Sequence, residues 1–125
     1  MSSAKIWLDE NGIIREVHSE PMVTLEVANH AIQERARIAG DEKKRVLVKF
    51  DRIFGFTEET QHLNLDVMLK NISALAFCVQ GKEEISLMQK MLIQRFYETT
   101  PYPVPVKVFY DEKSAIEWLM QYMRR

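Results

Sequence analysis

The sequence is poor in the residues that build metal, redox and nucleotide sites. It contains a single cysteine, Cys78, and three histidines that lie far apart in the chain. One thiol cannot form an internal disulfide or a multi-cysteine zinc site, and no two histidines have the spacing of paired metal ligands. The four glycines never cluster, so neither a Walker loop nor a dinucleotide-binding fingerprint is present. We therefore expect no metal and no cofactor.

Net charge and long apolar runs are also missing. The 125 residues include 17 Lys and Arg against 18 Asp and Glu, which gives a net charge of −1. This balance does not favour nucleic acid or anionic lipid as a partner. The longest apolar run, 74–79, is far shorter than the roughly 20 residues of a membrane-spanning helix. The N-terminus lacks the apolar core of a signal peptide, so we expect a cytoplasmic protein without a transmembrane segment.

Apolar periodicity predicts strands that alternate with helices. The Asn11-Gly12 pair between two apolar runs predicts an N-terminal hairpin, because a tight turn needs positive φ angles. Further strands are expected at 45–50, 72–80 and 106–110, and helices at 24–40, 57–70, 83–97 and 111–123. The order β-β-α-β-α-β-α-β-α predicts one α/β domain over residues 1–125. Its sheet is expected to be mainly parallel, with the antiparallel hairpin at the edge.

Local signals support these elements. Thr24, Thr57 and Asp111 stand where helix N-caps belong, and Gly40 stands where a helix is expected to end. The strand at 72–80 shows no polar alternation, which predicts that both of its faces are covered. We therefore expect Cys78 to be a small buried apolar residue rather than a reactive thiol.

Three segments carry a resemblance to a known family: V-T-L-E-V-A at 23–28, V-L-V-K at 46–49 and V-F-Y-D-E-K-S-A-I-E-W-L at 108–119. With the element order, they resemble the SpoIIAA-like, or STAS-type, domain, and in particular a subgroup of uncharacterised bacterial proteins. The resemblance covers roughly residues 5–123. It implies the fold of bacterial anti-sigma-factor antagonists and a non-catalytic domain that regulates by binding another protein.

In these antagonists the loop before the second helix carries an Asp-Ser-Ser-Gly-type motif, and phosphorylation of one serine disrupts docking. The matching stretch here has no such motif. Thr57 is the nearest hydroxyl and hence the candidate phospho-acceptor, but N-cap duty explains it better, and two glutamates that follow it would repel a phosphate. The resemblance therefore implies a docking loop without the phosphorylation switch. Its residues are Phe54, Gly55, Phe56, Thr57, Glu58 and Thr60.

Several interpretations of the apolar residues in this loop and in the expected helix at 83–97 stay open. They pack into the core, they form a surface that docks another protein or a second copy in a homodimer, or they bind a small hydrophobic ligand. A carrier or sensor of such a ligand predicts an internal cavity, lined by residues such as Phe77, Met88, Leu92 and Trp118. Catalysis is not expected, because no G-x-S-x-G elbow and no catalytic cysteine signature is present.

Overall fold

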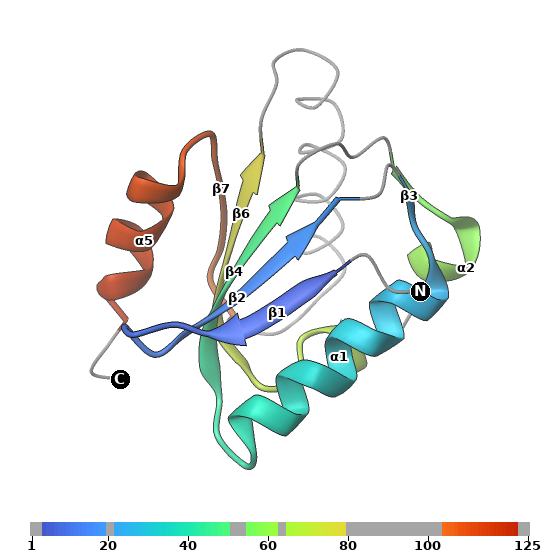
Figure 1. The fold of residues 1–125 in the computed structure, drawn as a ribbon, viewed down its shortest axis with the longest axis horizontal. Helices are drawn as coiled ribbons and strands as arrows, with labels where there is room; N and C mark the ends of the chain where they lie inside the picture. The colour runs from blue at the N-terminus through green and yellow to red at the C-terminus, as the bar shows by residue number, and fades with distance from the viewer. Residues whose placement is uncertain (1–3, 20–21, 51–54, 63–64, 80–103, 123–125) are drawn as a thin grey trace.

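The structure, a computed structural model, describes residues 4–19, 22–50, 55–62, 65–79 and 104–122 (Figure 1). Five strands form the main sheet in the order β1-β2-β4-β6-β7. Their bounds are β1 Lys5–Leu8, β2 Ile13–His18, β4 Lys44–Phe50, β6 Ile72–Val79 and β7 Val106–Phe109. Only β1 and β2 pair antiparallel, and the other neighbours in this sheet pair in parallel. The predicted mainly parallel sheet with an antiparallel hairpin at its edge is confirmed.

The hairpin forms for the reason that its sequence indicates. Gly12 has a φ of +76°, which a residue with a Cβ atom adopts only with strain. The Asp9 carboxylate accepts hydrogen bonds from the backbone N–H groups of Asn11 and Ile13, at 2.8 and 3.0 Å. These bonds fix the turn and hence the register of β1 against β2.

The helices also begin at the expected residues. Helix α1, Leu25–Ala39, starts after Thr24, whose hydroxyl accepts a hydrogen bond from the backbone of Val27, and ends at Gly40 with a φ of +64°. Helix α5, Glu112–Met120, starts after Asp111, which accepts from the backbone of Ser114. These caps satisfy N–H groups that have no partner inside a helix.

The single helix expected at 57–70 is a wrong prediction. Two short helices occupy this stretch, α2 Glu58–Gln61 and α3 Leu65–Met68. Thr57 caps α2 as predicted, but α2 ends at His62, and residues 63–64 lie outside the described part of the chain. Val67, in α3, is 44% exposed.

A second, two-stranded sheet was also missed. Strand β3, Met22–Val23, pairs in parallel with β5, Gly55–Phe56, in the stretch predicted to be loop. Strands of two residues are too short to produce a recognisable alternation of apolar and polar residues. Figure 1 places this pair beside α2, away from the main sheet. The helix expected at 83–97 lies outside the described residues.

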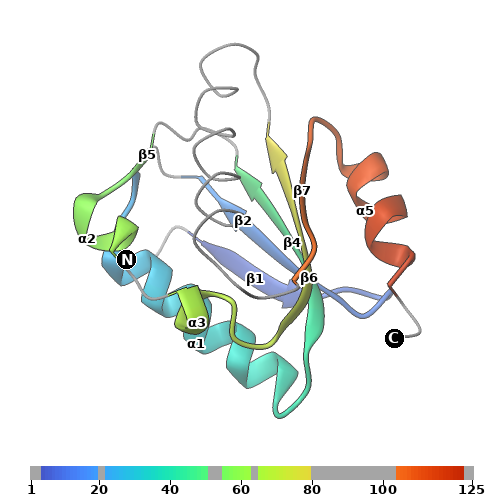
Figure 2. The same ribbon diagram turned by 180° about the vertical axis from the view of Figure 1, so that it is seen from behind.

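Helices cover both faces of the main sheet. Figures 1 and 2 show α1 on one side and α5 on the other, with α3 next to α1. Alternate residues of each strand supply the two cores: Ile14 faces the α1 side and Ile13 the α5 side, where Cys78 is buried as predicted. Burial of its thiol raises the Cys78 pKa. Strand β6 is therefore covered on both faces, as its apolar sequence indicates.

Candidate functional site

A cavity of about 80 Å³ lies between α1 and the main sheet. Most of its wall is apolar, and residues from α1, β2, β4, β6 and the region of α2 and α3 contribute to it. The apolar lining residues are Val23, Ala28, Ala31, Ile32, Val48, Phe50, Met68, Leu69, Ile72, Leu75 and Phe77. The polar lining residues are Glu16, His18, Arg35 and Thr60. A mainly apolar pocket with a few convergent polar groups is the usual form of a small-molecule site.

Three of the polar residues form one buried cluster around the Glu16 carboxylate. Nη1 of Arg35 donates to Oε1 of Glu16 at 2.7 Å, and Nε2 of His18 lies 2.5 Å from Oε2. Nη2 of Arg35 donates to the backbone carbonyl of Met68 at 2.7 Å. The Glu16, His18 and Arg35 side chains are no more than 7% exposed. The cluster therefore joins β2 to α1 and α3 at the cavity wall.

The charge of Glu16 is stabilised by its neighbours. Burial by itself raises the pKa of this carboxyl group. Attraction to the Arg35 guanidinium, attraction to His18 and the hydrogen bonds with both residues outweigh burial and lower the pKa to about 2. Glu16 is thus ionised at neutral pH, and Arg35 balances its charge. A buried carboxylate that stays ionised because each oxygen has a neighbouring donor is part of a structural network and a weak proton acceptor.

Two atoms of this cluster keep an unused hydrogen-bonding capacity. Nδ1 of His18 and Nε of Arg35 are buried and have no hydrogen-bond partner in the part of the chain that the structure describes. The His18 ring stacks on Phe50 with a centroid distance of 5.3 Å, and Phe50 stacks on Phe77 at 5.9 Å. One edge of the His18 ring is therefore held by Glu16, and its face packs against Phe50.

Sequence reasoning missed this cluster. Glu16 and His18 follow Ile14 at spacing two in a strand, so all three point to the α1 face of the sheet. Arg35 continues the inward stripe that Ala28 and Ala31 begin, at helical spacing. The available signal was the presence of charged residues at positions that the periodicity assigns to the core. The sequence analysis considered the histidines only as possible metal ligands and did not use this signal.

The expected docking loop is described only in part. Phe54 lies outside the described residues, and Gly55 and Phe56 form β5. Thr57 caps α2, and its hydroxyl lies 2.7 Å from the Thr60 hydroxyl. Glu58 is exposed.

Thr60, in contrast to Glu58, is buried. It is 2% exposed, its hydroxyl donates to the backbone carbonyl of Val23 at 3.1 Å, and it lines the cavity. The segment around α2 therefore has an outer side at Glu58 and an inner side at Thr60. Phosphorylation of Thr57 stays a prediction.

The residues expected to line a ligand cavity separate in the structure. Phe77 lines the cavity. Trp118 lies on the α5 side of the sheet, where its ring centroid is 5.7 Å from that of Phe109 and 5.2 Å from that of Tyr122. The prediction for Trp118 is wrong because α5 covers the opposite face from α1. Met88 and Leu92 lie outside the described residues.

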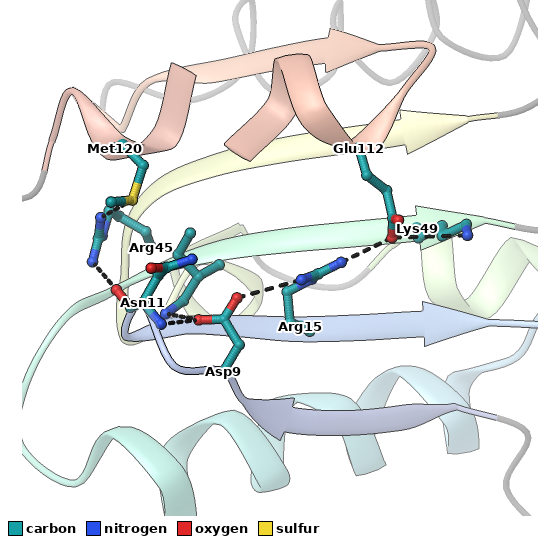
Figure 3. Close-up of polar contacts among 8 residues, drawn as sticks. Asp9, Asn11, Arg15, Arg45, Lys49, Glu112 and Met120 are labelled. Atoms are coloured by element: carbon teal, nitrogen blue, oxygen red, sulfur yellow. Dashed lines mark hydrogen bonds and ion pairs between the residues drawn. The ribbon is translucent and has the colours of Figure 1, made fainter. Parts of the chain in front are cut away.

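The α5 side of the sheet carries a second polar network, drawn in Figure 3. The Arg15 guanidinium lies between two carboxylates, 2.8 Å from that of Glu112 and 3.4 Å from that of Asp9. The Lys49 ammonium group is 3.8 Å from the Glu112 carboxylate. Arg45 joins a backbone carbonyl of the β1–β2 turn to a methionine sulfur in the last turn of α5. Both arginines have their donors directed to groups of the chain itself, so this network fastens α5 and the hairpin to the sheet.

Metal-binding clusters and membrane-spanning helices are both absent from the described residues. No group of three or more His, Cys, Asp and Glu side chains in this part of the chain is arranged to hold a metal ion. None of the helices described is both long enough and apolar enough to cross a membrane.

Comparison with solved structures identifies the class of fold. The chain is similar to an uncharacterised protein of the DUF3478 family with a SpoIIAA-like fold, from Shewanella loihica PV-4. The TM-score is 0.60 and the identity 18%, over 93% of this chain and 91% of that chain. The expected SpoIIAA-like fold is thereby confirmed. A protein of unknown function from Arthrobacter sp. FB24 is 20% identical over 97% and 96% of the two chains, but its TM-score of 0.31 supports no argument.

The family itself is defined by sequence. The model of a domain of unknown function, DUF7793, matches residues 6–123, so the chain belongs to this family. No curated protein is significantly similar to it. Fold and family together leave the function to be argued from the site.

Proposed function

We propose that this protein is a non-catalytic binding domain that holds a small, mostly apolar molecule in the cavity between α1 and the main sheet. The observation that carries the proposal is the combination of an apolar cavity with a buried polar cluster in its wall. A volume of about 80 Å³ is about half that of an engineered cavity that admits benzene. The ligand, or the part of it that enters, therefore has about three to four non-hydrogen atoms.

The chemistry of the cavity favours binding over catalysis. Glu16 is the carboxylate in its wall, and its pKa of about 2 makes it a weak general base. The nitrogen of His18 that faces Glu16 is already engaged. The remaining wall is aliphatic and aromatic, which supplies shape and burial of apolar surface.

A methyl-resolved NMR titration with 2-propanol, a probe of four non-hydrogen atoms, tests this function. We expect saturable shifts at the methyl groups of Val48 and Leu75 in the cavity wall. Ala31→Val places two extra methyl groups in the cavity, and we expect it to abolish these shifts. Ala36→Val is the matched control, because it makes the same change on the same helix outside the cavity lining. Equal binding by the two variants, or no shifts in the wild type, contradicts the proposal.

Docking of another protein is the second candidate function. The observation that favours it is the outer side of α2, where Glu58 and Glu59 are exposed next to the β3–β5 pair. The SpoIIAA-like fold supports it by resemblance to anti-sigma-factor antagonists. Because Thr60 of the same helix lines the cavity, a ligand there contacts the helix that would dock.

Native mass spectrometry of protein isolated from its own cells tests docking and self-association together. We expect a stoichiometric partner on the wild type that is lost in a Glu58→Lys, Glu59→Lys double variant. A Glu10→Lys, Glu117→Lys double variant changes two exposed glutamates elsewhere and should retain the partner. Retention by both variants argues against docking at α2, and a dimer mass that survives dilution supports self-association.

A further inference from the structure

We propose that the outer edge of β1 pairs with the same edge of a second copy of this chain, so that two main sheets join into one continuous sheet. Strand β1 lies at the end of the main sheet, and β2 is its only strand neighbour in the part of the chain that the structure describes (Figure 1). No residue of β1 lines the cavity between α1 and the sheet, so this inference does not depend on a ligand there.

The backbone of β1 offers hydrogen-bonding groups at this edge. The N–H of Asp9 donates to the Ile13 carbonyl at the start of β2, at 2.9 Å. Backbone groups along a strand point alternately to its two sides, so those of Trp7 point to β2 and those of Ile6 and Leu8 point outward. Outward groups of this kind are a template for pairing with another strand.

Apolar side chains are exposed at the same edge. Trp7 is 42% and Leu8 44% exposed. They lie on opposite faces of the sheet, because Trp7 pairs with Arg15 and Leu8 pairs with Ile14, which faces the α1 side. The Arg15 guanidinium lies 5.8 Å from the centroid of the Trp7 ring and restricts this ring before a partner binds.

The strand complements itself in one register. A two-fold axis perpendicular to the sheet brings residues of the same face opposite each other in two antiparallel copies of β1. With the axis at Trp7, Lys5 of one copy lies opposite Asp9 of the other. The same register places Ile6 opposite Leu8 and the two Trp7 side chains opposite each other. Cross-strand pairs of opposite charge and of apolar residues stabilise a sheet.

Neighbouring registers lack this complementarity. Moving the axis by one residue places Trp7 opposite Lys5 or opposite Asp9 and removes the charge pair. Asp9 also has a fixed position, because its carboxylate accepts hydrogen bonds from the backbone of Asn11 and Ile13. A partner of unrelated sequence would have to supply its own matching charges, whereas a second copy brings them.

The symmetry also limits the assembly to two chains. A two-fold pairing uses the same edge of both copies, so neither copy keeps an outward edge of β1 for a third. The pairs that form in this register join Ile6 to Leu8 in both directions, and each pair exchanges both of its N–H···O hydrogen bonds. The contact is small, so we expect a reversible dimer with a dissociation constant in the micromolar range.

Sedimentation velocity of the full chain over a range of concentrations measures this dimer. Leu8→Pro removes an outward N–H, a change that an edge strand tolerates because this group has no bond to β2. We expect it to raise the dissociation constant of the dimer at least about tenfold. Leu8→Ala is the matched control, because it shortens the same side chain and keeps the N–H, and its effect should be smaller. A wild type that stays monomeric, or equal dimerisation of the two variants, overturns the proposal.

A charge reversal tests the register and does not alter the backbone. Lys5→Glu places like charges opposite each other at Asp9 and should weaken the dimer. Lys113→Glu makes the same change at an exposed lysine on α5 and should leave it unchanged. Equal dimer affinity of these two variants contradicts the register. This comparison decides the matter if Leu8→Pro does not fold, because Lys5 is exposed.

Tryptophan fluorescence places the interface. The chain has two tryptophans, so in Trp118→Phe the emission comes from Trp7 alone. Burial of Trp7 between two copies should shift this emission to shorter wavelength over the concentration range in which the dimer forms. A dimer that forms without such a shift would lie elsewhere on the surface and would overturn the assignment to β1.

Discussion

Replacement of Glu16 by glutamine is expected to lower the free energy of unfolding strongly at neutral pH and little in acid. The folded-state pKa of about 2 lies below the ordinary value of 4.5. A group whose pKa falls on folding stabilises the fold when it is ionised. Its contribution is therefore fully present above about pH 4.5 and is lost as the pH falls toward about 2.

The size of the effect follows from the same pKa values. The gap between 4.5 and about 2, at about 1.4 kcal/mol for each pH unit, corresponds to about 3 kcal/mol for this fully buried group. The second estimate is independent: removal of one partner from a buried ion pair costs about 3–5 kcal/mol, because the other charge stays buried without compensation. Glu16→Gln leaves the charge of Arg35, which is 6% exposed, buried without its counter-charge. The two estimates agree, so a loss of about 3 kcal/mol is expected at pH 7.

Urea denaturation of the wild type and of Glu16→Gln at several pH values between 2.5 and 7 measures this directly. The difference between the two curves should be largest at pH 7 and should shrink as the pH falls below about 4.5. Glu34→Gln is the control, because Glu34 pairs with Arg37 at an exposed site on α1 and should have a much smaller effect. A difference of less than about 1 kcal/mol at pH 7, or one that does not depend on pH, would refute the assignment of a stabilising charge to Glu16.

Further predictions concern the rest of the fold. Leu119→Ala on α5 removes a fully buried side chain and should lower the free energy of unfolding by about 2–5 kcal/mol. The 2-propanol affinity should stay unchanged in NMR titration, and altered affinity would mean that the two faces are coupled. Thr24→Ala removes the α1 cap and should lower the free energy of unfolding, measured by urea denaturation, by about 1 kcal/mol. An unchanged free energy would show that the cap does not stabilise the fold. The Cys78 thiol should react with a thiol reagent only after denaturation, and rapid reaction in the folded protein would contradict its burial.

Local chemistry made much of the architecture predictable. The Asn11-Gly12 turn and the caps at Thr24 and Asp111 depend on residues that interact within four positions of each other, so the sequence shows them directly. The continuous apolar strand β6 indicated correctly that both faces of the sheet are covered. The parallel order followed from the alternation of strands with helices.

Longer-range features were not predictable in the same way. The break between α2 and α3 and the β3–β5 pair involve elements of two to four residues, which carry too little periodicity to recognise. Glu16 and Arg35 are 19 positions apart, and their contact exists only because α1 packs across β2. A cavity has no sequence signal of its own, since its wall comes from segments that meet only in the fold.

Xenon binding tests most directly whether the cavity holds an apolar guest. Xenon occupies dry apolar cavities in proteins and forms no hydrogen bonds, so it reports on the cavity alone. In crystals of the protein under xenon pressure, we predict one xenon atom between α1 and the sheet, in contact with Ala31, Val48 and Phe50, and no xenon there in Ala31→Val. Wild-type crystals without xenon at this position, or equal occupancy in the two proteins, would contradict a ligand site between α1 and the sheet.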